Sequence, residues 1–431
     1  MRITHSLISL AFGCLASGSL FATWDVPDAV CSSYEAWQIQ WNPRTDPNGF
    51  RNSAYPEASA TYWSTVLDQP LGTEVVITGR FPQARYMAIQ VYDEQRNVMG
   101  AINDAQINPD AGQNNPFRTG SAQGTYSIRV VFGRQPLRPA PNTVYTANLT
   151  NVMIVYRIYY SNNPEDLTGG VDLPVVTLGG RALSSCPPRP IIRPEELTVW
   201  GRLDDSDWAG TDSSSLNGAT DPPKWILSVT NRFTPYYPSA DNSYMSASIS
   251  RAFLKAPHNN DMVVFRFRAP SFANTQAGEP PYLAVQDRQV RFWSVCQDEP
   301  LTTGVVRCAP DNEAAVKDGF ATFVISDPSK RPSPEVLAQH GASWLPWGAL
   351  QGTDQVYDIE GNLIGNNESA FFNGLILYRQ TVPNPNFSQG MAAVGQLPRS
   401  EWRSAMGDYW PAIGYCTTAA FESLGAGCIK Q

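Results

Sequence analysis

The chain has 431 residues and a formal net charge of −8, from 31 basic and 39 acidic residues, and the basic residues are scattered, which argues against a nucleic-acid partner. Hydrophobic residues make up 42% and aromatic residues 11%, which excludes an intrinsically disordered chain. Only 16% of residues are charged, and the 35 prolines and 32 glycines are typical of a loop-rich, secreted β protein.

The first 22 residues have the layout of a secretory signal peptide. Met1-Arg2 supplies a positive start, Leu7 to Leu20 is mostly apolar, and small residues cluster from Ala16 to Ala22. The apolar stretch is shorter than the roughly 20 residues that a membrane span needs, and no later segment qualifies. We therefore expect cleavage near Ala22, no transmembrane segment, and a periplasmic or extracellular location.

Cleavage also removes Cys14, the alternative attachment point for a lipid, although Phe12 stands where a small residue is usual. Six cysteines then remain, and an even count in an exported protein predicts three disulfides. Their positions favour the pairs Cys31 with Cys186, Cys296 with Cys308, and Cys416 with Cys428. No Cys-x-x-Cys pair is present, which argues against a zinc site.

Two long segments of the chain resemble each other. The matched runs are Asn151-Val-Met-Ile-Val-Tyr-Arg157 with Asn373-Gly-Leu-Ile-Leu-Tyr-Arg379, Arg85-Tyr-Met-Ala-Ile with Arg291-Phe-Trp-Ser-Val, Tyr55-Pro-Glu-Ala with Tyr237-Pro-Ser-Ala, and Asn108-Pro109-Asp110 with Ala309-Pro310-Asp311. Each copy spans more than a hundred residues and is large enough to close its own core, so the pattern predicts tandem domains rather than a solenoid.

Strand patterns dominate both copies, because runs rich in Val, Ile, Tyr and Phe alternate with turn residues. In chain order the predicted strands are Glu74 to Thr78, Tyr86 to Tyr92, Tyr126 to Phe132, Val152 to Tyr160, Met262 to Arg268, Arg291 to Cys296, Ala321 to Ser326 and Gly374 to Tyr378. The predicted helices are short: Glu35 to Trp41, Ser333 to Gln339 and Ser400 to Met406. The sequence therefore predicts a mainly all-β protein made of two antiparallel β-sandwich or jelly-roll-like domains.

The predicted domain boundaries follow from composition. They are the signal peptide (1–22), an N-terminal segment (23–53), the first sandwich (54–183), a proline-rich connector (184–235), the second sandwich (236–398) and a disulfide-closed tail (399–431). Cys186-Pro-Pro-Arg-Pro makes the start of the connector stiff. Because Trp200 and Trp208 lie within it, we expect the connector to dock on a neighbouring domain.

The loop from Asp104 to Asn115 is dense in oxygen donors. A calcium site there would use Asp104, Asn108, Asp110 and Asn114. The full calcium-loop spacing is missing, and the same residue types are the ordinary residues of turns. Turn formation is the favoured interpretation, calcium is the alternative, and no other cofactor is expected.

A loop found only in the second copy places His340, Trp344 and Trp347 close together. Planar aromatic faces suit apolar or sugar ligands, so these three residues are candidates for ligand contact. The alternative is that Trp344 plugs the end of the sandwich. Arg157 and Arg379 occupy the same place in both copies; a ligand clamp is one interpretation, and packing on an aromatic with a carboxylate such as Asp93 or Asp298 is the favoured one.

The second copy resembles a bacterial domain of unknown function. The resemblance rests on Ala342-Ser-Trp344-Leu345-Pro346, on the strand that ends at Leu377-Tyr-Arg379, on Asn384-Pro385, and on Arg291-Phe-Trp-Ser-Val. That domain is often paired with a second uncharacterised domain. The first copy lacks the Trp-Leu-Pro turn. The resemblance implies a shared fold and brings no established catalytic residue.

Signals for catalysis are weak. A nucleophilic triad would need His258 or His340, and the chain has no Gly-x-Ser-x-Gly motif. A carboxylate pair for glycoside chemistry would come from Asp298, Glu299, Asp311 and Glu313. We therefore expect an exported, non-catalytic binding or interaction protein for a glycan, an envelope component or a small apolar molecule. A secreted hydrolase with its site in the interdomain groove is the alternative.

Overall fold

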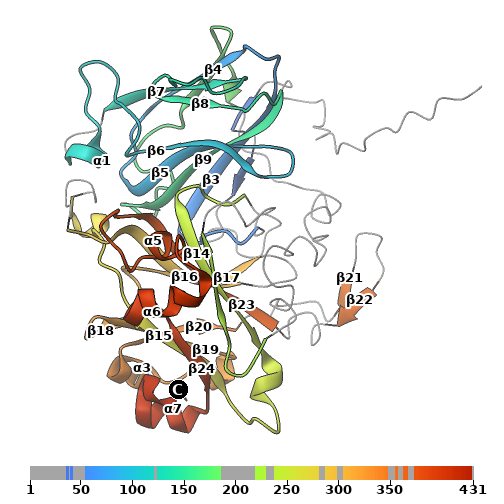
Figure 1. Ribbon diagram of the computed structural model, residues 1–431, viewed down its shortest axis with the longest axis vertical. Helices are drawn as coiled ribbons and strands as arrows, with labels where there is room; N and C mark the ends of the chain where they lie inside the picture. The colour runs from blue at the N-terminus through green and yellow to red at the C-terminus, as the bar shows by residue number, and fades with distance from the viewer. Residues whose placement is uncertain are drawn as a thin grey trace, which may run out of the picture.

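The computed structural model describes residues 35–37, 39–41, 54–120, 124–185, 219–229, 237–280, 287–298, 304–347, 355–357, 363–366 and 373–429. Within these residues the chain forms four β-sheet layers stacked along the long axis of the molecule (Figure 1). Two layers form an N-terminal lobe (residues 54–185 with the short strands at 35–41), and two form a C-terminal lobe (residues 219–429). The predicted class, mainly antiparallel β-sandwich with short helices, is confirmed.

The N-terminal lobe packs an outer sheet, ordered β11-β10-β4-β7-β8, on an inner sheet, ordered β2-β3-β9-β5-β6. The outer strands are Arg181–Ala182 (β11), Val175–Leu178 (β10), Glu74–Arg80 (β4), Thr125–Val131 (β7) and Thr143–Tyr145 (β8). The inner strands are Ile39–Trp41 (β2), Ala60–Asp68 (β3), Asn151–Ser161 (β9), Ala84–Tyr92 (β5) and Val98–Asn103 (β6). A short helix, Pro116–Thr119 (α1), follows β6.

Burial along these strands distinguishes the two layers. In β7, buried Tyr126, Ile128 and Val130 alternate with half-buried residues, as in a sheet with one face on the core. Every residue of β5 is buried, because one face of this strand packs in the sandwich and the other faces the C-terminal lobe. The inner sheet is therefore covered on both sides.

The C-terminal lobe repeats this arrangement with its inner sheet ordered β13-β14-β23-β16-β17 and its outer sheet ordered β18-β19-β15-β24, where β20 pairs with β19. The inner strands are Trp225–Val229 (β13), Asn242–Ser250 (β14), Asn373–Pro383 (β23), Val290–Asp298 (β16) and Val305–Pro310 (β17). The outer strands are Val316–Lys317 (β18), Phe320–Ser326 (β19), Met262–Arg268 (β15), Ala412–Cys416 (β24) and Ala342–Pro346 (β20).

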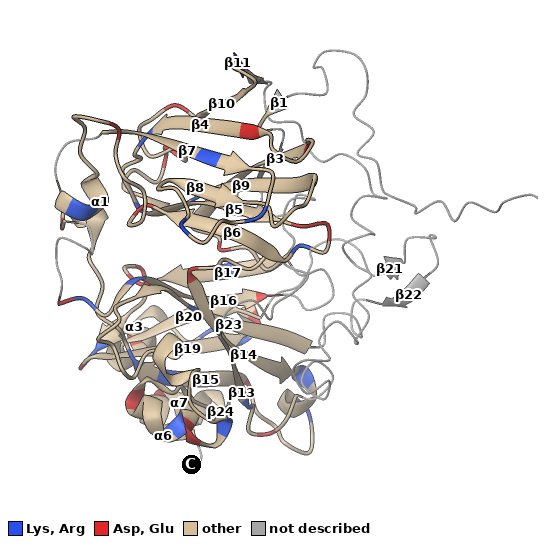
Figure 2. Cartoon of the chain, turned by 45° about the horizontal axis from the view of Figure 1, so that its top comes forward, with Lys and Arg blue, Asp and Glu red and all other residues tan. Residues whose placement is uncertain are grey.

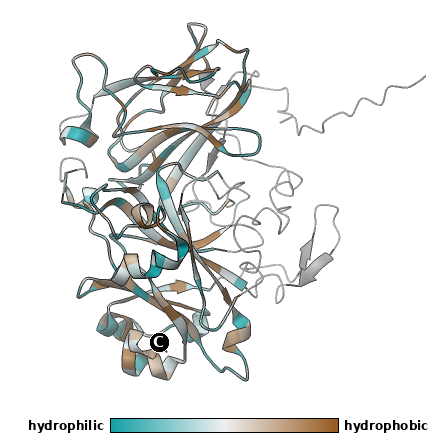
Figure 3. Cartoon of the chain, in the orientation of Figure 1, coloured by the Kyte–Doolittle hydropathy of each residue, from teal (hydrophilic) through white to brown (hydrophobic). Residues whose placement is uncertain are grey.

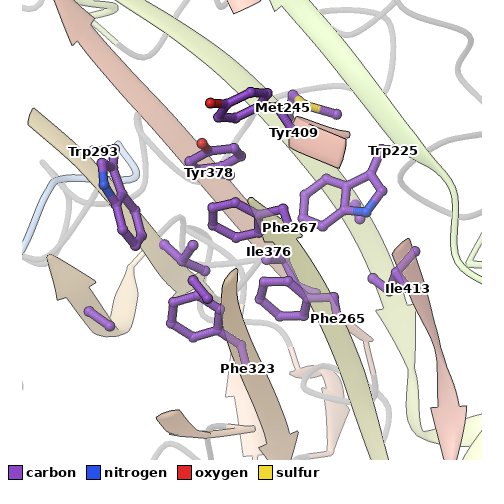
Figure 4. Packing of buried hydrophobic residues seen from close by; sticks show 14 of the residues in the cluster. Trp225, Met245, Phe265, Phe267, Trp293, Phe323, Ile376, Tyr378, Tyr409 and Ile413 are labelled. Carbon is purple, nitrogen blue, oxygen red and sulfur yellow. The ribbon is translucent and has the colours of Figure 1, made fainter. Parts of the chain in front are cut away.

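Aromatic side chains fill the space between these two sheets (Figure 4). Phe267 of β15 lies 4.4 Å from the ring of Tyr378 and 5.6 Å from Trp293, measured between ring centroids. Phe265 stacks on Phe323 at 5.1 Å. Hydrophobic residues follow the strands inside both lobes (Figure 3), so each lobe has its own core, as the sequence composition requires.

Two helices cover the outer face of the C-terminal lobe, Pro334–His340 (α3) and Thr418–Leu424 (α7). Ser333 caps α3 by accepting a hydrogen bond from the Val336 amide, and Gly341 ends it in the left-handed conformation at φ 57°. The Cys416–Cys428 disulfide joins β24 to the turn after α7. Two further helices are Met391–Val394 (α5), which lies beside β13 and β14, and Trp402–Met406 (α6), which packs against α5.

Two of the three predicted helices are confirmed, at Ser333 to Gln339 and Ser400 to Met406. The prediction of a helix from Glu35 to Trp41 was wrong. There the chain forms Glu35–Ala36 (β1), paired with Ser184–Ser185 (β12), and then β2, paired with β3. Trp37 adopts a positive φ of 57° between them and packs in the N-terminal core, so tertiary packing overrides the local pattern. Among the described residues no helix is long and apolar enough to cross a membrane.

Candidate functional site

The inner sheets of the two lobes face each other in the middle of the molecule (Figure 1). Buried polar side chains lie between them, and we call this the interlobe layer. Most charged residues lie on loops, helices and strand ends (Figure 2). The interlobe layer is an exception, because it buries four arginines and four carboxylates: Arg85, Arg157, Arg291, Arg379, Glu57, Asp104, Asp298 and Asp311. Buried charges of this kind need partners, and they are the strongest candidates for a functional site.

Arg85 of β5 crosses to the C-terminal lobe. Its guanidinium donates hydrogen bonds of 3.0 and 2.9 Å to the two carboxylate oxygens of Asp311, and both side chains are fully buried. Phe272 of the C-terminal lobe packs on the same guanidinium at 4.9 Å. Burial raises the pKa of Asp311 to about 6 although Arg85 favours the ionised form, so at neutral pH this pair is ionic.

Arg291 of β16 makes the reciprocal contact. It donates a 2.8 Å hydrogen bond to Asp104, which follows β6 as Asp311 follows β17. The second oxygen of Asp104 accepts from the Met87 amide, and that of Asp311 accepts from the Trp293 amide. The contacts therefore match Asp104 with Asp311, and the sequence alignment of Asp110 with Asp311 was wrong.

The third pair joins Arg379 of β23 to Glu57, which lies in the loop before β3 of the other lobe. Arg379 Nη1 lies 3.2 Å from the Glu57 carboxylate and 2.7 Å from the sulfur of Cys296. Ser294 donates a short hydrogen bond to the same carboxylate. The Cys296–Cys308 disulfide, formed as predicted, thus lies against the interlobe layer.

Asp298, at the end of β16, belongs to the same cluster. It is fully buried, and neither carboxylate oxygen makes a hydrogen bond with the part of the chain that the structure describes. Burial raises the pKa of Asp298 to about 8; Glu57 adds to this shift, whereas Arg379 opposes it. At neutral pH this carboxyl is therefore mainly protonated.

Arg157 of β9 lies among tyrosines. Its Nη2 donates a short hydrogen bond to the hydroxyl of Tyr92, and its guanidinium lies 5.4 Å from the ring of Tyr62 and 5.8 Å from that of Tyr92. The expected carboxylate partner Asp93 accepts instead from Asn97 in its own turn. Arg157 and Arg379 are therefore both buried side chains in this structure.

The aromatic loop of the second copy does not form a platform of two indoles. Trp347 is fully buried in the core of the C-terminal lobe, with Arg251 over its ring at 5.0 Å. Trp344 is half-buried on β20; its indole N–H donates to Ser326 at 2.9 Å, and Arg331 stacks over the ring at 4.5 Å. His340 contacts the Glu422 carbonyl and the ring of Phe421. Of the two indoles, that of Trp344 is half-buried and that of Trp347 is fully buried, while His340 is half-buried as well.

The calcium hypothesis competes with protein contacts. The carboxylate of Asp104 is engaged by Arg291 and Met87, and the side-chain oxygen of Asn108 accepts from Arg118. Asp110 and Asn114 lie in the loop that precedes α1. Among the described residues, Glu57, Cys296 and Cys308 bring three potential metal-ligand atoms close together, but the disulfide occupies both sulfurs.

The histidines lie apart from the interlobe carboxylates. His258 pairs with Asp221 on the surface at 3.3 Å, and His340 lies beside α7. A small pocket at the lobe junction has no histidine, cysteine or carboxylate among its lining residues, which include Ser59, Tyr160 and Gln276. The described residues therefore assemble no nucleophilic triad. Cys31, Cys186, Trp200, Trp208 and Glu299 lie outside the described residues.

No family model and no curated protein matches this chain. Among solved structures, an uncharacterised protein from Burkholderia cenocepacia is similar at 13% identity and a TM-score of 0.49, over 90% of this chain and 84% of that one. The VPA0106 protein from Vibrio parahaemolyticus is similar at 13% identity and a TM-score of 0.38, over 84% of this chain and 90% of that one. Procruciferin, an 11S globulin from Brassica napus, is similar at 9% identity and a TM-score of 0.19, over 92% of this chain and 93% of that one.

Proposed function

We propose that this chain is an exported, non-catalytic binding or interaction protein built as one rigid two-lobed body. The observation that carries the proposal is the reciprocal pairing of Arg85 with Asp311 and of Arg291 with Asp104, all fully buried between the lobes. A hydrolase of the interdomain groove needs titratable groups that reach a substrate. Here those groups are used to join the lobes.

The half-buried face of Trp344 is the surface that we propose for ligand contact. Arg331 stacks on the indole at 4.5 Å, and Ser326 fixes the ring by accepting its N–H. A fixed indole beside a guanidinium offers an apolar face and polar donors together, which suits a glycan, an anionic envelope component or a small apolar molecule. Trp347 is buried in the core of the C-terminal lobe and anchors the loop there.

We also infer that the two lobes are tandem copies of one domain, related to the bacterial domain of unknown function that the second copy resembles. The inner sheets support this inference, because β3, β9, β5 and β6 occupy the same places as β14, β23, β16 and β17. The Glu57 amide donates to Tyr62, and the Ser239 amide donates in the same way to Tyr244. The two disulfides are in keeping with export to an oxidising compartment, as the proposed signal peptide requires.

The test is a thermal-shift screen of the mature, oxidised protein against glycans, anionic lipids and small apolar molecules. A ligand at 100 times its Kd stabilises the folded state by about 2.7 kcal/mol. We expect Trp344→Ala to lose this shift, and the control Leu424→Ala, which alters another exposed apolar residue, to keep it.

A parallel panel of hydrolase substrates tests the alternative function. We expect no turnover above the background of a denatured sample. Turnover that disappears in both Glu57→Gln and Asp298→Asn, with the two variants folded, would overturn the proposal and place an active site in the interlobe layer.

A further inference from the structure

Among the described residues, one of the four interlobe arginines, Arg157, has no carboxylate partner. Arg85, Arg291 and Arg379 each pair with a carboxylate of the other lobe. Arg157 is 2% exposed and makes no ion pair with any described carboxylate; its Nε makes no hydrogen bond. A guanidinium stays charged at every accessible pH, so burying it without an anion is strongly unfavourable.

The matching half of the interlobe layer shows what is missing. Glu57 reaches Arg379 and contacts Cys296, and Asp298 lies in the same cluster. Ser239 stands at the position that corresponds to Glu57. The Ser239 hydroxyl accepts a hydrogen bond from the Gln90 side chain, and Glu57 makes the corresponding contact with Cys296. Tyr92 is the last residue of β5, and Asp298 occupies the corresponding position as the last residue of β16. Both acids of the Arg379 half are thus replaced by neutral residues around Arg157.

The tyrosines do not supply the missing negative charge. The hydroxyl of Tyr92 lies 2.6 Å from the side-chain oxygen of Gln90 and 2.9 Å from the Pro238 carbonyl. Both oxygens only accept, so the hydroxyl keeps its proton, and burial raises the pKa of Tyr92 further. The hydroxyl of Tyr86 donates a 2.7 Å hydrogen bond to the carboxylate of Asp241. Asp241, the nearby carboxylate, accepts from Tyr86 and from Asn103 and forms no ion pair with Arg157.

We propose that Arg157 binds a small monovalent anion, a halide or a carboxylate of formate size, inside the interlobe layer. Nε of Arg157 supplies a charged donor, and Tyr159, whose hydroxyl accepts from Asn242 at 3.4 Å, supplies a neutral O–H. The anion balances the charge of Arg157 as Glu57 balances that of Arg379. It stabilises the joint between the lobes, independently of any ligand at Trp344.

The test uses thermal unfolding of the mature, oxidised protein in chloride, bromide, formate and sulfate at constant ionic strength. We expect the parent Tm to rise by about 1 to 2 °C per tenfold increase of the bound anion above its Kd. The choice of salts identifies the bound anion, because a halide site responds to chloride and bromide, whereas a carboxylate site responds to formate. Sulfate reports the general salt effect.

The key variant is Ser239→Glu, which installs the equivalent of Glu57 and should satisfy Arg157 from within the chain. We expect it to be at least as stable as the parent in low salt and to lose the anion response. A second measurement does not depend on the folding of this variant. Crystals of the parent protein soaked in bromide should give an anomalous diffraction peak beside Arg157. Identical anion responses in both proteins, or bromide bound only at the surface, would overturn the proposal.

Discussion

Arg85 and Asp311, 226 residues apart in the chain, form a buried ion pair with two hydrogen bonds across the lobes. We expect Asp311→Asn to lower the free energy of unfolding by about 3 to 5 kcal/mol, because it leaves the Arg85 charge buried without its partner. The double variant Arg85→Met/Asp311→Leu should recover much of the loss, since both charges are then removed. Urea unfolding measures both; a single variant as stable as the parent would show that the pair does not join the lobes.

Asp298 makes stability depend on pH. Because burial raises its pKa to about 8 in the folded state, its stabilising contribution is full below about pH 4 and is lost as pH rises through 8. Across that window the loss is at most about 1.4 kcal/mol per pH unit. Asp298→Asn cannot ionise, so its stability relative to the parent should increase from pH 5 to pH 8. Urea midpoints at four pH values test this, and parallel curves for the two proteins would refute it.

The two tryptophans of the aromatic loop should differ sharply in stability. Trp347→Ala removes a fully buried ring from the core, and we expect it to cost about 3 to 5 kcal/mol. Trp344→Ala removes a half-buried ring, and we expect a smaller cost, about 1 to 2 kcal/mol. Equal losses in urea unfolding would mean that Trp344 is a core plug rather than a surface for ligands.

The C-terminal disulfide should be structural. Cys416 and Cys428 are 12 residues apart and fasten α7 to β24, so replacing both with alanine should cost about 3 kcal/mol through the greater freedom of the unfolded chain. Increased hydrogen exchange in residues 417–429 should accompany the loss. No change in either measurement would show that the packing of Phe421 is sufficient to hold the helix.

The third predicted disulfide, Cys31 with Cys186, remains to be tested because both cysteines lie outside the described residues. The flanking strands β1 and β12 pair with each other, which favours this connection. Peptide mapping of the non-reduced, mature protein should identify one peptide that links the two segments. Free thiols at both positions would contradict the prediction.

The sequence predicted part of the strands: the run rich in Val, Ile and Tyr from Val152 to Tyr160 matches β9 within one residue at each end. It did not predict β3 or β14, which pair with β9 and β23. It also paired Arg85 with Arg291 and Arg157 with Arg379 as matching positions. The carboxylate partners of Arg85, Arg291 and Arg379 could not be predicted, because each of these contacts crosses between the lobes. The local sequence around Asp104 indicates only a turn or a calcium ligand, since its partner Arg291 is 187 residues away. Glu57 carried no local signal, because its partner Arg379 is 322 residues distant.

The measurement that most directly tests the rigid two-lobed body is urea unfolding followed by pulsed hydrogen exchange. Peptides over β4 and β7 report the N-terminal lobe, and peptides over β15 and β19 report the C-terminal lobe. If the buried ion pairs join the lobes into one body, both sets of peptides unfold at the same urea concentration, and Asp311→Asn separates their midpoints. Separate midpoints already in the parent would show that the lobes are independent, and the interlobe layer would then be free to open to a substrate.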